Sequence, residues 1–158
     1  MKITLLTIGK TSFPYLQTGI DLYQKRLERY TTFDVRVLPD VRGAKKMPAE
    51  ELKKREGEVL LKFIDDGDLL FLLDERGKTF GSVDFAHWLE RHLRSGKRKI
   101  VFAVGGAYGF SDAVYARANG KLSLSKMTFS HQMIRVFFVE QLYRAFTILR
   151  GEPYHNEG

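Results

Sequence analysis

Apolar and polar positions along this chain follow two periods, one typical of strands and one typical of helices. Strand patterns occupy Lys2–Ile8, 33–38, 68–73, 99–105 and 121–125, and the third and fourth of them are almost continuously apolar. Helical spacing of apolar residues occurs between successive strands. Strands that alternate with helices predict a parallel sheet, and continuously apolar central strands are typical of a sheet covered on both faces. The sequence therefore predicts one α/β domain.

Polar residues mark the expected starts of several helices. Ser12, Ser82 and Ser111 each precede a helical pattern, and serine is a favoured N-cap because its hydroxyl accepts a hydrogen bond from a free backbone N–H. Pro14 fits the first turn of the first helix. Residues 39–48 carry glycine, prolines and basic residues, which predicts a loop before a charged helix that ends near residue 64.

The last helical pattern, residues 131–149, has no broad polar face. A helix on the surface of a small domain normally shows one. This pattern predicts burial on nearly every side, because large exposed apolar faces are rare. Its polar positions are Gln132, Arg135, Glu140, Gln141, Arg144 and Thr147.

Composition narrows the possible functions. The 158 residues suffice for one domain with a sizeable core, and the absence of cysteine excludes disulfides and thiolate chemistry and suits a cytoplasmic protein. No apolar run approaches the length that spans a bilayer, so we expect no membrane segment. A net charge of +7 favours polyanionic partners, although a solvated basic surface is equally compatible with it. Basic clusters occur at Lys25-Arg26, Lys45-Lys46 and Lys97-Arg98-Lys99.

Three expected strand ends carry candidate binding residues, at 72–77, 104–109 and 122–127. Ligands of open α/β sheets bind beyond the carboxyl ends of strands. The glycines of the second segment do not match a dinucleotide motif, because they occur late in the chain and no acidic residue follows at the required distance. The lysine of a phosphate-binding loop is also absent. A tight strand-to-helix turn explains these glycines equally well.

Titratable residues give weaker signals. Asp74 and Glu75 are adjacent and could form a general acid/base pair. Side chains at adjacent extended positions point to opposite sides, however, so the two are not expected to share a substrate. A loop turn with an ion pair to Arg76 fits this segment better. The four histidines form no metal-binding motif, and we expect no metal. His131 lies at the start of the last helix, where the helix N-terminus disfavours its protonated form.

The strings VGG, LSLSKMTF, HQM, EQLYRA and YH, at residues 104–106, 122–129, 131–133, 140–145 and 154–155, closely resemble the RlmH family of bacterial SPOUT methyltransferases. The resemblance extends from the first strand to the tail and is most specific in the last third. It implies a SPOUT-type α/β fold, single-domain over residues 1–158, with a deep C-terminal trefoil knot and the cofactor site within about residues 72–158. It also implies a homodimer.

The resemblance implies a reaction and a set of residues. The cofactor is S-adenosylmethionine, and the substrate is a pseudouridine of 23S ribosomal RNA, methylated at N3 in the assembled ribosome. His155 is expected to take or to orient the N3 proton, and Tyr154 to stack on or position the target base. Arg144 is the candidate electrostatic or positioning group, and the tail is expected to contribute little to stability. The residues expected to bind the cofactor are Leu72, Leu73, Gly105, Gly106, Leu122, Ser123, Leu124, Ser125, Lys126 and Met127.

Two positions depart from the family pattern. Ser130 stands where relatives often have proline, and serine can start a helix in its place. Asn156 stands where relatives often have arginine or lysine, which puts a role of the tail in gripping RNA in doubt. Two other functions stay open: a ribosome-binding protein of this fold without catalysis, and a SPOUT methyltransferase with another target, such as a ribose of transfer RNA.

Overall fold

All five strands of the sheet run parallel, in the order β2-β1-β4-β3-β5. The computed structural model describes residues 1–156, so the last two residues of the predicted 1–158 domain lie outside the described part. The strands are β1 (Lys2–Ile8), β2 (Thr32–Leu38), β3 (Leu69–Thr79), β4 (Lys99–Val104) and β5 (Gly120–Ser123). The parallel α/β domain predicted from the alternation of elements is therefore confirmed.

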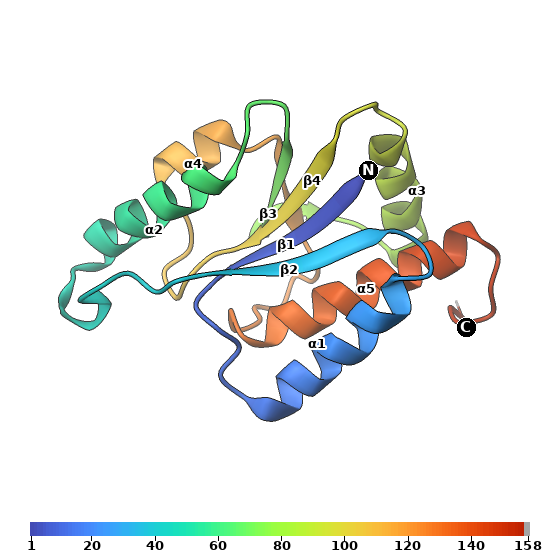
Figure 1. Cartoon of the computed structure of the whole chain (residues 1–158), viewed down its shortest axis with the longest axis horizontal. Helices are drawn as coiled ribbons and strands as arrows, with labels where there is room; N and C mark the ends of the chain where they lie inside the picture. The colour runs from blue at the N-terminus through green and yellow to red at the C-terminus, as the bar shows by residue number, and fades with distance from the viewer. Residues whose placement is uncertain (157–158) are drawn as a thin grey trace.

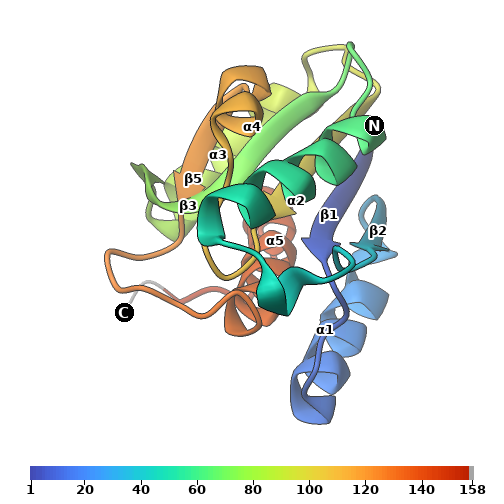
Figure 2. The ribbon, with the colours of Figure 1, turned by 90° about the vertical axis from the view of Figure 1, so that its left-hand side faces the viewer.

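Helices cover both faces of this sheet (Figures 1 and 2). One face carries α1, α3 and α5, and the other carries α2 and α4. Their bounds are α1 (Pro14–Leu27), α2 (Ala49–Phe63), α3 (Ser82–Leu93), α4 (Asp112–Arg117) and α5 (Met133–Leu149), with a short 3-10 helix η1 (Ala44–Lys46) in the basic loop. Within residues 1–156, no helix has the length and hydropathy needed to cross a membrane.

The central strands supply the two halves of the core. Phe71 and Phe102 point toward α3 and α5, and the ring of Phe102 lies 4.7 Å from that of Phe138 on α5. Leu70 and Val101, one position away, pack under α2 and α4. Because side chains alternate along a strand, both faces of β3 and β4 are buried, which explains their continuously apolar sequences.

Most of α5 is covered within the single chain. It lies between α1 and α3 and over the sheet, as Figure 1 shows. An outward strip remains, in which Phe137 is 39% exposed and Glu140, Gln141 and Arg144 are partly buried. The fully buried positions are Arg135, Phe138, Val139, Leu142, Ala145, Phe146 and Thr147.

A buried arginine connects the start of α5 to the end of β1. Arg135 is 1% exposed, and its guanidinium donates hydrogen bonds to the carbonyl oxygens of Ile8 (3.1 Å), Gly9 (2.9 Å) and His131 (3.0 Å) and to the hydroxyl of Thr11 (3.2 Å). A buried charge is tolerated when it is hydrogen-bonded in this way. These contacts hold the segment before α5 at the carboxyl edge of the sheet.

Two of the predicted serine caps are wrong. Phe13 is the N-cap of α1, and Ser12 instead donates its backbone N–H to Oε1 of Gln132. Gly81 is the N-cap of α3, and Ser82 is the first helical residue. The short helix expected to begin near Ser111 is α4, and the hydroxyl of Ser111 caps it by accepting a hydrogen bond from the backbone N–H of Val114.

The segment before α5 contains a turn that includes Ser130, the position at which the family resemblance led us to expect proline. Its hydroxyl accepts a hydrogen bond from the backbone N–H of Met133 at 3.1 Å. Serine thus satisfies one free donor at the start of α5, as expected.

Strand β3 is longer than the sequence predicts. It continues past Leu73 to Thr79, with a register shift against β5 between Leu73 and Lys78. Both of these residues align with Leu122. Gly77 packs directly on the backbone of β5, where a Cβ atom would come within 2.6 Å of the Leu122 nitrogen. The shift makes room for a bulge at the carboxyl edge.

The trefoil knot expected from the family resemblance stays a prediction.

Candidate functional site: a pocket at the strand ends and a cluster on the tail

A pocket of about 1030 Å³ lies at the carboxyl ends of β3, β4 and β5. Residues 73–76, 104–110 and 120–125 line it, together with the turn at residues 127–131. The three strand ends singled out from the sequence therefore meet at one place. A parallel sheet has this property because the carboxyl ends of its strands share one edge.

Most residues expected to bind the cofactor lie in this pocket. Leu72 does not, because its side chain is buried under α2 and α4, on the opposite face of β3 from Leu73. Lys126 is exposed and also does not line it. Those that line it are Leu73, Gly105, Gly106, Leu122, Ser123, Leu124, Ser125 and Met127.

The glycine segment forms a tight turn, which was the alternative interpretation from sequence. The backbone N–H of Gly109 donates to the carbonyl of Gly106 at 3.1 Å, and Gly109 has a φ of 86°, a value that favours glycine. A Cβ atom at Gly106 would lie 2.5 Å from Oε2 of Glu56 on α2. The turn therefore packs against a side chain behind the pocket, and its backbone faces the pocket.

Glu56 was not identified from the sequence. Burial raises the pKa of its carboxyl, and the nearby carboxylate of Asp40 raises it further. Among the described residues, Oε1 of Glu56 is buried without a hydrogen-bond partner. A charged helix offers no local signal that one of its glutamates faces inward.

Asp74 forms the predicted ion pair with Arg76, at 3.5 Å. The hydroxyl of Tyr115 also donates to Asp74. Burial alone would raise the pKa of Asp74, but the hydrogen bonds from Tyr115 and Arg76 outweigh it, so that the pKa lies below its ordinary value. Glu75 instead accepts a hydrogen bond from Thr128, so the two adjacent carboxylates serve different partners, as expected.

His131 lines the pocket beside the start of α5. Burial lowers the pKa of its imidazole, the guanidinium of Arg135 lowers it further, and Asp40 acts in the opposite direction. The sequence predicted the direction of this shift, but from the helix terminus and not from burial. A neutral imidazole therefore faces the pocket at neutral pH.

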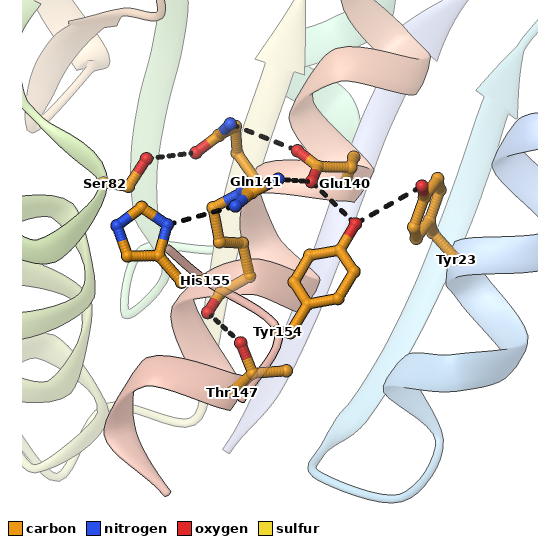
Figure 3. A network of polar contacts seen from close by, with 8 residues as sticks. Tyr23, Ser82, Glu140, Gln141, Thr147, Tyr154 and His155 are labelled. Carbon is orange, nitrogen blue, oxygen red and sulfur yellow. Dashed lines mark hydrogen bonds and ion pairs between the residues drawn. The ribbon is translucent and has the colours of Figure 1, made fainter. Parts of the chain in front are cut away.

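A second group of polar residues lies along α5 and the tail (Figure 3). This tail cluster consists of Glu140, Arg144, Tyr154 and His155. Glu140 accepts hydrogen bonds at Oε1 from Nη2 of Arg144 (2.5 Å) and from the hydroxyl of Tyr154 (2.9 Å). Nη1 of Arg144 lies 3.0 Å from Nδ1 of His155. The three residues expected to be catalytic are therefore in mutual contact, with Glu140 added.

The tail is packed onto the rest of the chain. The ring of Tyr154 meets that of Tyr143 edge-on at 4.7 Å, and the guanidinium of Arg144 lies 4.8 Å from its centroid. Burial raises the pKa of Tyr154, and hydrogen bonds to Tyr23 and Glu140 raise it further. This phenol therefore keeps its proton at physiological pH.

The tail cluster and the pocket lie apart in one chain. None of the four tail-cluster residues lines the pocket, whereas Ile134, in the first turn of α5, does. Arg144 follows ten residues later, which is about 15 Å along a helix at 1.5 Å per residue. One chain alone thus does not bring the two groups of predicted residues to one substrate.

Neither group resembles a metal centre. Within residues 1–156, no three or more histidine, aspartate or glutamate side chains are grouped as ligands for a metal ion. The pocket offers apolar side chains and backbone polar groups, and the tail cluster offers hydrogen-bonding side chains and a guanidinium.

Known proteins resemble this chain over its whole length. The family model "Predicted SPOUT methyltransferase" matches residues 1–155. The chain is 52% identical to "Ribosomal RNA large subunit methyltransferase H" of Flavobacterium johnsoniae and 51% identical to the protein of the same name from Parabacteroides distasonis, covering 99% of this chain and 100% of each relative. A solved structure, "a probable methylase family protein" of Haemophilus influenzae, matches with a TM-score of 0.55 at 14% identity, over 99% of this chain and 70% of that one. That last likeness concerns the fold alone.

Proposed function

Because the chain belongs to the SPOUT methyltransferase family, we propose that it methylates N3 of a pseudouridine in 23S ribosomal RNA, within the assembled ribosome, using S-adenosylmethionine. Relatives with about half of their residues identical carry the name of a large-subunit ribosomal RNA methyltransferase. The observation that carries the proposal is the pocket of about 1030 Å³ in which three strand ends converge. Such an enzyme works where ribosomes are, in the cytoplasm.

The residues of the pocket fit an adenosyl sulfonium compound. Leu73, Leu122 and Leu124 supply apolar surface for an adenine and a thioether chain. The turn from Gly105 to Gly109 exposes backbone N–H and C=O groups, which can bind the polar edges of a base and a ribose. Binding sites of this kind are mostly apolar with a few placed polar groups. When bound, the cofactor supplies a methyl group on a positively charged sulfur.

The substrate nitrogen is an imide, which is nucleophilic only after it loses its proton. The residues of the site would therefore have to hold this nitrogen in line with the methyl group that the cofactor would supply. Aligning the two reactants contributes much of the rate. Tyr154 and His155 would contact the target base, and Arg144 would position them and stabilise the developing anion.

A homodimer would bring the pocket and the tail cluster together. In an isologous pair the same face meets itself around a two-fold axis. If the outward strip of α5 pairs in an antiparallel way about Glu140 and Gln141, the Ile134 end of one helix lies beside the Ile148 end of the other. The partly exposed Phe137, whose ring lies 4.8 Å from that of Phe129, supplies apolar surface for this contact. The pocket of one subunit would then receive the tail of the second.

Methylation of isolated ribosomes tests the proposed function. Ribosomes from a strain that lacks the enzyme should accept one labelled methyl group, and mass spectrometry should place it on a 23S pseudouridine. Ribosomes that already carry the modification are the matched control and should accept none. Binding to ribosomes without cofactor binding would identify a non-catalytic protein, and a methyl group on transfer RNA would identify another target.

Mixed subunits test the dimer. A subunit with a blocked pocket and a subunit with a truncated tail should each be inactive, and the mixture should regain part of the activity because one hybrid site is complete. A clean monomer by light scattering at micromolar concentration would exclude this arrangement.

A further inference from the structure

The contact between Arg144 and His155 determines where His155 carries its proton. Nη1 of Arg144 lies 3.0 Å from Nδ1 of His155. A guanidinium has five donors and no acceptor, and it stays protonated at any physiological pH. In this contact Nδ1 is therefore the acceptor, and the proton of the neutral ring is on Nε2.

Glu140 fixes the orientation of that guanidinium. Its Oε1 accepts from Nη2 of Arg144 at 2.5 Å, one helical turn away, while its Oε2 accepts from Gln141 at 3.1 Å. Gln141 in turn accepts a hydrogen bond from the hydroxyl of Ser82 on α3 at 3.0 Å. Both carboxylate oxygens are thus engaged, and Figure 3 shows Glu140 beside Gln141 and Ser82. The contacts of Arg144 hold its side chain between Glu140 and His155.

We propose that Glu140 is a positioning residue which, through Arg144, holds Nδ1 of His155 as a hydrogen-bond acceptor and leaves the ring proton on Nε2, so that the tail presents a hydrogen-bond donor to the substrate and not a base. The purpose of these contacts among Glu140, Arg144 and His155 rests on the proposed function, whereas their geometry does not depend on it. Of the two roles expected for His155 from the sequence, taking the N3 proton or orienting it, this role excludes the first.

The alternative role of His155 conflicts with the same contacts. In the held tautomer Nε2 already carries a proton and has no lone pair to accept another. Protonation at Nδ1 would place a ring N–H against a guanidinium N–H, with two cations 3.0 Å apart. The imide proton therefore leaves to solvent, and the Nε2–H of His155 donates to a carbonyl oxygen of the resulting anion. The charged and titratable groups that face this site include Glu140, Tyr143 and Arg144 on α5, Tyr154 on the tail and Tyr23 and Arg26 on α1, and α3 contributes the hydroxyl of Ser82.

Side-chain nitrogen NMR of the uniformly labelled protein tests the tautomer directly. His155, assigned by the loss of its signals in His155→Gln, should show a protonated Nε2 and an unprotonated Nδ1 at neutral pH. A protonated Nδ1, or an imidazolium at neutral pH, would overturn the proposal. This readout needs no substrate, so it stands even if ribosomes prove not to be methylated.

Two substitutions at His155 separate a donor from a base in the reaction. Glutamine keeps an N–H near the position of Nε2 but cannot act as a base at neutral pH, whereas alanine keeps neither function. We expect single-turnover methylation to fall about a hundredfold in His155→Ala, the cost of one donor to a developing anion, and to stay within about tenfold of the wild type in His155→Gln. Equal losses in both variants would show that His155 is a base.

Glu140→Gln tests the positioning role. The amide keeps the shape but loses the charge that holds Arg144, so His155 should populate both tautomers and kcat should fall about tenfold or more, with the Kd for S-adenosylmethionine unchanged. Glu140→Asp, which keeps the charge, should restore part of the loss. The matched control is Glu90→Gln, which breaks the exposed Glu90–Arg94 pair of the same spacing on α3 and should change neither reading. An unchanged His155 tautomer in Glu140→Gln would refute the role of Glu140.

Discussion

The carboxylate of Glu56 packs directly against the Cα atom of Gly106, where a side chain would come within 2.5 Å of Oε2. The glycine turn at the end of β4 is therefore restricted from behind by α2, in addition to any ligand in front of it. Substitutions in this turn affect stability before they affect binding, and the two effects need separate measurements.

Gly106→Ala should lower the free energy of unfolding by about 1–3 kcal/mol, the usual range for overpacking. In a Glu56→Ala background the added methyl group has room, so the cost should fall to a small fraction of this value. Urea unfolding of the two single variants and the double variant gives the coupling. Gly67→Ala is the control, because a Cβ atom there meets nothing within 4 Å. Additive single effects would show that Glu56 and Gly106 do not clash.

Glu56→Gln should stabilise the protein at neutral pH. Burial, with Asp40 as a second cause, raises the pKa of Glu56, so the folded state binds this proton more tightly than the unfolded state. The ionised carboxylate thus lowers stability above its folded pKa, and this penalty disappears as the pH falls below the unfolded value near 4.5. The unfolding midpoint in urea should rise at pH 7 and stay nearly unchanged at about pH 4. A loss of stability at both pH values would show that the charge is favourable where it lies.

Tyr115→Phe should destabilise the protein by about 1 kcal/mol at neutral pH, the typical value of one hydrogen bond. The hydroxyl contributes to the lowered pKa of Asp74, whose stabilisation is present above the unfolded pKa and is lost as the pH falls through the folded pKa. The difference between wild type and variant should therefore shrink on acidification. Thermal unfolding from pH 7 to pH 3 measures it, with the exposed Tyr15→Phe as control. A constant difference would disconnect Tyr115 from the titration of Asp74.

Truncation after Gly151 should lower stability as well as activity. The sequence suggested that the tail serves chemistry alone, but the hydroxyl of Tyr30 donates to Glu152 at 2.6 Å and the ring of Tyr154 packs on Tyr143 and Arg144. The expected loss is about 1–3 kcal/mol, which lowers Tm by roughly 2–10 °C for a domain of this size.

Tyr30→Phe removes one of these contacts without shortening the chain, and it should reproduce part of the loss in Tm while keeping His155. Calorimetry of both variants decides the point. A truncated protein with the wild-type Tm would show that the tail contacts contribute nothing to stability.

The basic clusters should differ in their contribution to ribosome binding. Lys45-Lys46 follows β2 at the carboxyl edge of the sheet, which also holds the pocket, whereas Lys97-Arg98-Lys99 precedes and begins β4 at the opposite edge. Neutralising Lys45 and Lys46 should flatten the salt dependence of binding by about one unit of slope for each phosphate that the variant no longer binds. The same change at Lys97 and Arg98 should leave the slope unaltered. The reverse result would place the RNA on the amino edge.

The fold could be predicted because its main determinants are local periods. A strand buried on both faces is continuously apolar, and a helix buried on one face shows apolar residues at helical spacing. Both patterns can be recognised within a short stretch of sequence. The failed caps have a different cause. The backbone N–H of Ser12 donates to Gln132, the N-cap of α5, and the hydroxyl of Ser82 donates to Gln141 on α5. These partners lie 120 and 59 positions away in sequence, so no local pattern indicates them.

The candidate site was predictable in part. The three strand ends converge by the geometry of a parallel sheet, yet Leu72 and Leu73 differ in exposure to the pocket only through the pleat of β3. The role of Glu140 could not be predicted, because it depends on how the tail folds back onto α5. Family resemblance identified Tyr154 and His155, but only the structure shows the contact that fixes the proton of His155.

The guanidinium of Arg135 has a consequence for synthesis of the chain. Its acceptors at Ile8 and Gly9 are translated 127 and 126 residues earlier. At elongation rates of roughly 5–20 residues per second, the ribosome adds Arg135 about 6 to 25 s after it adds these two residues. A nascent chain that stops before residue 135 lacks the guanidinium that these carbonyl groups bind, so the end of β1 gains its native hydrogen bonds only after the first residues of α5 have been made.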